Sequence, residues 1–276
     1  MLFSDLRQHA AQQINPKDAL PTRWTAADGA MARCRFRLYV SYACPWSHRA
    51  LIARVLNDLE DAVELVDVEP EMDAIGWRLA VGGPHLADTY RSYAPWYTGK
   101  ATVPLMVEVA TGQVVSNESA DLMRMLGTLI RGSGERLFPA AHAAACDVWN
   151  HDVQINVNKR VYQFGFAATN EEKILKTRAL METFWSLDQS LAKRRYLVTD
   201  DVPLEPDWRL WTTLARYELA YRPFMLSSCA VPLTAFTSLT RFFAELLAVP
   251  GISATYRMDE IATHYSARLR DLAADR

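Results

Sequence analysis

Cys44 is the residue of this sequence whose type and position most clearly indicate chemistry. Apolar residues alternate over 36–42 ahead of it and recur every three or four positions over 51–59 behind it, which predicts a strand and then a helix. Because Pro45 suits the first helical position, Cys44 is expected at or near the N-cap. The N–H groups and positive dipole of a helix start favour the thiolate, which attacks sulfur and electrophilic carbon. We therefore predict a reactive cysteine; the alternative is a small buried apolar residue.

The residues after Cys44 indicate which cysteine chemistry is available. The motif is CPWS, with Ser47 where a dithiol motif would carry its second cysteine. A disulfide between Cys44 and another molecule must then be resolved by an external thiol, which predicts a monothiol mechanism. His48 and Arg49 follow within the next turn or so, and we interpret them as a solvated polar helix face in preference to direct catalytic groups.

The elements that must position Cys44 follow an α/β pattern. A second strand is predicted over 62–68, so that strand, helix and strand make a βαβ unit. A third strand over 102–109 contains Pro104, which belongs at a strand start or an edge and is a candidate for a cis bond. A turn and a short strand over 113–116 complete a hairpin.

A predicted helix start after this hairpin offers a second group of functional side chains. The N–H and hydroxyl of Ser119 can hold a carboxylate, and Glu118 beside it can hold an amine. The alternative is ordinary capping by Ser116 or Asn117, and caps are commoner than ligand sites.

Residues 70–101 form a long connection that is rich in aromatic side chains. We interpret it as a segment folded over the mouth of a site, because long connections inside compact domains are usually functional or disordered and the aromatic content argues against disorder. The alternative, at equal weight, is a packed surface excursion whose rings fill a local core.

The sequence predicts three regions. Residues 1–33 read as an irregular lead-in, 34–137 as an α/β domain with 70–101 as an insertion, and 138–276 as an all-helical domain. Helical spacing in the last region is found at 140–162, 170–191, 205–219, 239–247 and 258–272.

The composition narrows the function classes. A net charge of -2 and a pI near 6.3 give no reason to expect nucleic acid as a partner. The four cysteines are widely spaced without a metal-ligand pattern, which fits a reducing compartment and predicts no metal. No stretch reads as a signal peptide or a membrane span, so we expect a cytoplasmic protein without a membrane partner.

Taken together, several motifs resemble the glutathionyl-hydroquinone reductases, which are the Xi class of glutathione transferases. The motifs are CPWS with His48 and Arg49, TVP at 102–104, SNES at 116–119, VYQFGFA at 161–167, RYELAY at 216–221, VPGI at 249–252, and late His264 with Tyr265. The resemblance runs from about residue 20 to the C-terminus. It implies a glutathione transferase fold, with a thioredoxin-like domain followed by an all-α domain.

The resemblance also implies residue roles. Cys44 would be the nucleophile, and Val103, before a cis Pro104, would pair its backbone with the cysteinyl part of glutathione. Glu118 and Ser119 would hold the γ-glutamyl end, Trp77 and Lys100 would flank the tripeptide, and Tyr162 and Tyr265, with Tyr221 as a further candidate, would line the acceptor pocket.

The implied activity is the reduction of glutathionyl-hydroquinones through a disulfide between Cys44 and glutathione, with release of oxidised glutathione. The implied partners are glutathione, as co-substrate, a small aromatic conjugate and a second copy of the chain in a homodimer. One alternative is an Omega-like enzyme acting on disulfides or dehydroascorbate, and another is a non-catalytic transferase fold used for binding.

Overall fold

The computed structural model describes residues 34–80, 82–128, 136–163, 167, 169–225 and 229–274. The predicted lead-in and residues 164–166 of the VYQFGFA motif lie outside the described residues. The chain divides into two compact units, and the division falls between Leu137 and Phe138. We call the described part from Cys34 to Leu137 the sheet unit and the described part from Phe138 onward the helical unit.

The sheet unit is built on a four-stranded mixed sheet with the order β2-β1-β3-β4. Strand β1 pairs with β2 in parallel and with β3 antiparallel, and β3 pairs antiparallel with β4. The strands are β1 (Phe36–Val40), β2 (Val63–Asp67), β3 (Leu105–Glu108) and β4 (Gln113–Ser116). The parallel β1–β2 pair joined through a helix, followed by a hairpin, confirms the predicted thioredoxin-like fold.

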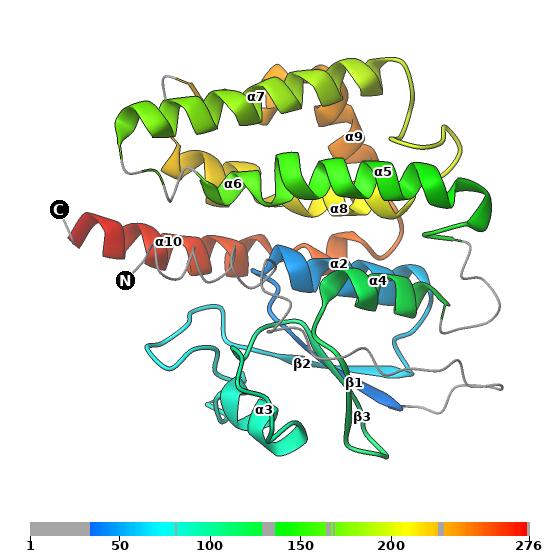
Figure 1. The fold of residues 1–276 in the computed structure, drawn as a ribbon, viewed down its shortest axis with the longest axis vertical. Coiled ribbons are helices and arrows are strands. Elements are labelled where there is room, and N and C mark those ends of the chain that lie inside the picture. Colours follow the sequence, from blue (N-terminus) through cyan, green and yellow to red (C-terminus); the bar gives the residue numbers. More distant parts are fainter. Residues whose placement is uncertain are drawn as a thin grey trace. The chain divides into compact units, whose positions relative to one another are not determined.

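Helices α2 (Pro45–Leu56) and α4 (Ser119–Thr128) pack together over one face of the sheet (Figure 1). Strand β1 is buried because it lies inside the sheet, and Phe36, Leu38 and Val40 have no exposed surface. The end of β1 therefore leads directly into the start of α2 at Cys44, so the sheet fixes the position of that residue.

The predicted connection over 70–101 contains a helix that the periodicity analysis did not identify. Helix α3 (Leu86–Tyr93) buries Leu86, Thr89 and Tyr90. Ahead of it, the isolated bridges Val68–Leu79 and Arg78–His85 fold the chain back on itself. The segment is thus an ordered part of the sheet unit.

The helical unit contains the predicted helices, with two differences. The helix predicted over 205–219 ends at Arg216 and is followed by a π-helical turn over 217–221. The segment predicted as a single helix over 140–162 is split into a 3-10 turn, α5, a π-helical turn called η2, and α6, because the wide turn interrupts the α-helical spacing. The elements are η1 (Ala140–His142), α5 (Ala143–Val153), η2 (Gln154–Asn158), α6 (Arg160–Gln163), α7 (Asn170–Ala192), α8 (Glu205–Arg216), the π-helical η4 (Tyr217–Tyr221), η5 (Arg222–Phe224), η6 (Leu233–Ala235), α9 (Thr237–Leu247), η7 (Ser253–Thr255) and α10 (Met258–Ala274).

Helix α8 forms the centre of the helical unit, and all 12 of its residues are buried. Trp208 and Trp211 supply the largest apolar side chains. Its buried Glu205 forms an ion pair with Arg209 and accepts a hydrogen bond from the Asn150 amide at 2.9 Å. Pairing of this kind is what lets charged side chains enter a core. Within the described ranges, no helix is both long enough and apolar enough to cross a membrane.

Candidate active site

Cys44 occupies the N-cap of α2, as predicted from its position before Pro45. Its backbone is extended, with φ -81° and ψ 122°, and Pro45 lies in the first turn. The side chain is 3% exposed, and its thiol donates to the carbonyl oxygen of Val103 at 3.7 Å. The bond between Val103 and Pro104 is cis, which confirms that expectation. The structure thus brings together Cys44, Val103 and Pro104, three of the residues predicted for the site.

The prediction of a solvated polar face at His48 and Arg49 is wrong. His48 is fully buried and Arg49 is 1% exposed, and α2, which carries both residues, packs against α4. The Arg49 guanidinium stacks over the Trp46 ring, 4.4 Å from its centroid, and donates to the Ser119 hydroxyl at 3.4 Å. The stacking was missed from the sequence, although the three-residue spacing of Trp46 and Arg49 was an available signal, and the contact with Ser119 had no local signal.

Glu118 and Ser119 stand at the start of α4, where the sequence predicted them. Ser119 is the first residue of the helix and is buried, and Glu118 is half-buried. The Ser116 hydroxyl accepts a hydrogen bond from the Glu118 N–H at 3.0 Å. Ser116 therefore satisfies a backbone donor just before the helix, as the capping alternative predicted. The two interpretations are compatible, because this local contact uses neither the Glu118 carboxylate nor the Ser119 hydroxyl.

Tyr90 of α3 connects the aromatic segment to the site residues. Its hydroxyl donates to the Thr102 carbonyl at 2.8 Å and accepts from the Asn117 amide at 3.3 Å. Thr102 directly precedes Val103, and Asn117 directly precedes Glu118. Burial raises the pKa of Tyr90 to about 12, so the phenol keeps its proton at neutral pH. One hydroxyl therefore bridges the two chain segments that carry the predicted glutathione contacts.

Within the aromatic segment, Trp77 precedes α3 and Lys100 follows it. Trp77 is buried, and its carbonyl accepts a hydrogen bond from the Leu86 N–H at 2.8 Å, which ties it to the start of α3. Lys100 is exposed, and its carbonyl accepts from the Tyr97 hydroxyl at 3.0 Å. Their predicted contacts with glutathione stay predictions.

The helical unit brings together the three tyrosines predicted for the acceptor pocket. The hydroxyls of Tyr162, in α6, and Tyr221, the last residue of η4, lie 3.2 Å apart, with their rings edge to face. The ring of Tyr265, in α10, lies 5.7 Å from that of Tyr221, also edge to face. All three side chains are buried. We call these residues the tyrosine cluster.

The surroundings of the tyrosine cluster keep its central member protonated. Burial, and next the neighbouring Tyr265, raise the pKa of Tyr221 well above its ordinary value. Arg216, which is fully buried and donates to the Thr212 carbonyl at 2.8 Å, opposes this shift through its charge. The central phenol of the cluster, Tyr221, therefore keeps its proton in a buried environment.

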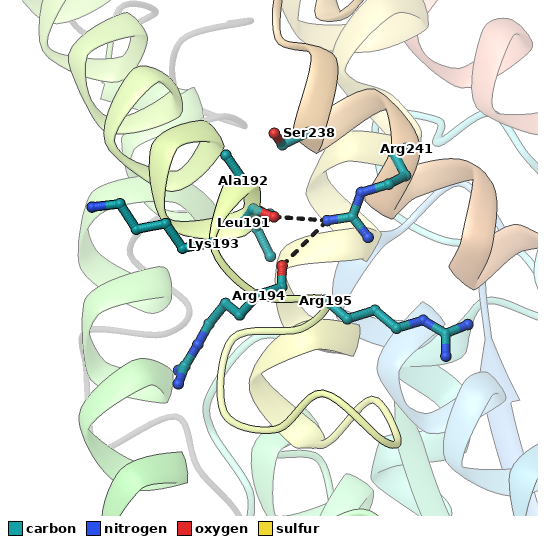
Figure 2. Close-up of a pocket in the computed structure, with 7 residues that line it drawn as sticks. All are labelled: Leu191, Ala192, Lys193, Arg194, Arg195, Ser238 and Arg241. Carbon is teal, nitrogen blue, oxygen red and sulfur yellow. Dashed lines mark hydrogen bonds between the residues drawn. The ribbon is translucent and has the colours of Figure 1, made fainter.

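A cavity of about 460 Å³ opens elsewhere in the helical unit, between the end of α7 and the start of α9 (Figure 2). Arg241 crosses it and donates to the carbonyls of Leu191 at 2.8 Å and Arg194 at 3.3 Å. The lining residues are Leu191, Ala192, Lys193, Arg194, Arg195, Ser238 and Arg241. Figure 2 shows the side chains of Lys193, Arg194 and Arg195 pointing away from one another. None of the predicted site residues lines this cavity. The hydrogen bond from Arg241 to the Leu191 carbonyl caps the last turn of α7.

Over the part of the chain that the structure describes, no group of three or more His, Cys, Asp or Glu side chains is placed to hold a metal ion.

Sequence comparisons relate the chain to known proteins. The family model described as "Glutathione S-transferase, N-terminal domain" matches residues 43–129. The chain is 32% identical over 267 residues to the glutathionyl-hydroquinone reductase YqjG of Escherichia coli, covering 88% of this chain and 80% of the relative. It is also 32% identical over 206 residues to the glutathione S-transferase omega-like 2 of Schizosaccharomyces pombe, covering 68% of this chain and 66% of the relative.

Solved structures that resemble this chain are also glutathione transferases. The glutathione-bound structure of Escherichia coli YqjG matches with a TM-score of 0.77 at 32% identity, covering 87% of this chain and 82% of that one. The Xi glutathione S-transferase of Phanerochaete chrysosporium matches with a TM-score of 0.79 at 30% identity, covering 90% of each chain.

Proposed function

Because the chain belongs to the glutathione transferases, among the Xi-class glutathionyl-hydroquinone reductases, we propose that it reduces glutathionyl-hydroquinones through a disulfide between Cys44 and glutathione. The products are the free hydroquinone and oxidised glutathione. The observation that most supports this substrate class is the tyrosine cluster, because a carbon centre that loses sulfur needs a proton and a disulfide exchange does not.

In the first step, the Cys44 thiolate attacks the sulfur of the glutathionyl group. The new sulfur–sulfur bond forms as the carbon–sulfur bond breaks, and the electron pair of the broken bond moves to the ring carbon. A phenol of the tyrosine cluster protonates that carbon, which completes the reduction of the ring. Both sulfur atoms are oxidised in this step, since they end as a disulfide.

In the second step, a second glutathione regenerates the enzyme. Its thiolate attacks the glutathione sulfur of the mixed disulfide, releases oxidised glutathione and returns Cys44 as a thiolate. An external thiol is required because residue 47 is serine, and the Ser47 hydroxyl already accepts a hydrogen bond from the Ser41 N–H at 3.3 Å.

The proposed glutathione site lies in the sheet unit. The Val103 carbonyl, 3.7 Å from the Cys44 sulfur, belongs to the peptide that would pair with the cysteinyl part of glutathione. Glu118 and the start of α4 would receive the γ-glutamyl ammonium and carboxylate, with Trp77 and Lys100 beside the tripeptide.

The test is turnover of a glutathionyl-hydroquinone with excess glutathione, in wild type and in Cys44→Ser. We expect equal amounts of hydroquinone and oxidised glutathione from the wild type, and loss of both from Cys44→Ser with an unchanged melting temperature. Continued turnover in the variant would disprove the mechanism.

A second candidate function is Omega-like disulfide reduction, which the Schizosaccharomyces pombe relative favours. It uses the same Cys44 and the same mixed disulfide, but it needs no proton donor to carbon. A Cys44–glutathione adduct detected by mass, together with no hydroquinone release, would favour this function over the first.

A further inference from the structure

We propose that Arg49 is a positioning residue, which fixes the Ser119 hydroxyl as a donor to the carboxylate of the γ-glutamyl group. The inference rests on the proposed function, because it takes glutathione as the ligand of the sheet unit. It adds Arg49 to the residues that recognise glutathione and gives it a role separate from that of Cys44.

The first step is the placement of Arg49 between two site elements. Arg49 lies on α2, the helix that begins after Cys44, and its guanidinium reaches Ser119 at the start of α4. These two helices pack side by side over the sheet (Figure 1). Stacking on Trp46 at 4.4 Å and burial to 1% exposure restrict the guanidinium to one orientation.

The second step is the hydrogen-bond polarity. A guanidinium carries donors and no acceptor, whereas a hydroxyl carries one donor and two acceptor positions. Because Arg49 donates to the Ser119 oxygen at 3.4 Å, it occupies an acceptor position of that hydroxyl. The hydroxyl hydrogen must then point away from Arg49. Ser119 is therefore prepared to donate to an acceptor, which is what a carboxylate requires.

The third step is the electrostatics. The positive end of the α4 dipole and the Arg49 cation lie at the same place, and a buried cation acts more strongly than an exposed one. Glu118, the residue before Ser119, adds a carboxylate at the same helix start. A hydroxyl donor held by a cation and an adjacent carboxylate suit the α-amino acid end of a γ-glutamyl group, with its carboxylate at Ser119 and its ammonium at Glu118.

The experiment compares two ligands by calorimetry on the full chain. The first is S-methylglutathione, which cannot form a disulfide, and the second is its analogue in which a 4-aminobutyryl group replaces γ-glutamyl and so lacks the carboxylate. We expect wild type to prefer S-methylglutathione, and we expect Arg49→Met to reduce that preference roughly tenfold, since hydrogen bonds to charged groups are of that size. Arg49→Lys should restore part of the preference, because it keeps the charge.

Two further variants separate this role from a structural one. Arg54→Gln is the matched control, because Arg54 lies on the same helix but donates to the carbonyls of Val63 and Glu60, and we expect it to leave the preference unchanged. Arg49→Met and Ser119→Ala should not add in the double variant, because both remove the same interaction.

An unchanged preference in Arg49→Met, or full additivity with Ser119→Ala, would overturn the inference while leaving glutathione binding intact. Absence of S-methylglutathione binding to the wild type would overturn the proposed function as well. If Arg49→Met shows no cooperative unfolding, the preferences of Arg49→Lys and Ser119→Ala decide: a reduced preference in both supports the inference, and wild-type preference in both overturns it.

Discussion

Cys44 is the N-cap residue of α2, and the dipole at the start of a helix stabilises negative charge. We predict that its thiol pKa lies below the value of about 8.5 for an unperturbed cysteine. The measurement is the rate of alkylation by iodoacetamide as a function of pH, with Cys44→Ser as the background for the other three thiols. A midpoint at the ordinary thiol value would contradict the prediction.

The tyrosine cluster separates protonation of carbon from exchange at sulfur. We predict that Tyr162→Phe or Tyr265→Phe lowers hydroquinone release about 100-fold, the order expected for loss of a general acid. Reduction of a small glutathione mixed disulfide should stay within about twofold of wild type, because that reaction needs no proton on carbon.

The matched control for this prediction is Tyr217→Phe. Tyr217 is a buried tyrosine of the same η4 turn, but its hydroxyl donates to the Val231 carbonyl at 2.7 Å and takes no part in the cluster. Equal losses of both activities in Tyr162→Phe would assign that residue to the fold and not to the reaction.

At the scale of elements, α3 supplies the Tyr90 hydroxyl, which links Thr102, the residue before Val103, to Asn117, the residue before Glu118. We predict that Tyr90→Phe raises the KM for glutathione several-fold with a smaller change in kcat, and costs about 1–3 kcal/mol of stability, because buried partners lose their hydrogen bonds. Steady-state kinetics and urea unfolding measure the two effects.

Tyr97→Phe is the control for Tyr90→Phe, because the Tyr97 ring packs on Tyr90 with centroids 5.1 Å apart, while its hydroxyl donates to the Lys100 carbonyl in an exposed hydrogen bond. Its effect on stability should stay within about 0.5 kcal/mol. Wild-type KM values in Tyr90→Phe would show that the bridge does not position the site.

The elements could largely be predicted from apolar spacing, because β1, the hairpin and the long helices each have a buried face. Helix α3 could not be predicted in this way. It has 8 residues, too few for a clear period, and it begins after His85, which is not a usual N-cap residue. Its start depends on Asp88, which accepts from the His85 N–H at 3.2 Å, and on the bridge of Tyr90 to distant residues.

At the scale of the whole molecule, Asp207 makes the global stability depend on pH. Burial raises the pKa of this carboxyl group to about 7, although it accepts hydrogen bonds from the Leu197 and Leu204 N–H groups, both at 2.8 Å. The folded protein therefore binds a proton that the unfolded chain releases near pH 4. The sign follows: the contribution to stability is full below about pH 4 and is lost as the pH rises to about 7.

We predict that the difference in unfolding free energy between wild type and Asp207→Asn falls by at most about 4 kcal/mol over this pH range. Urea unfolding at several pH values measures it. Asp73→Asn is a control of opposite sign, because His85, the Ile75 N–H and other donors hold the pKa of Asp73 well below its usual range, so its contribution is lost as the pH falls. A difference that rises with pH for Asp207→Asn would contradict the prediction.

The candidate site could be predicted only in part. The N-cap position of Cys44 depends on residues next to it, such as Pro45, so it could be predicted from the sequence. The burial of Arg49 depends on α4, which begins 70 residues later, and no local pattern contains that contact. The tyrosine cluster joins α6, η4 and α10, and only the resemblance to a family, not periodicity, pointed to its members.

The two π-helical turns, η2 and η4, determine how two members of the tyrosine cluster are placed. A π-helical turn closes its hydrogen bond one residue later than an α-helical turn does, so it holds one more residue. One turn ends shortly before Tyr162, and the other ends at Tyr221. Deleting one residue within 217–220 would close the wide turn and rotate Tyr221 by about 100° about the helix axis relative to α8. We therefore expect the deletion of a single codon to break the contact between the Tyr162 and Tyr221 hydroxyls.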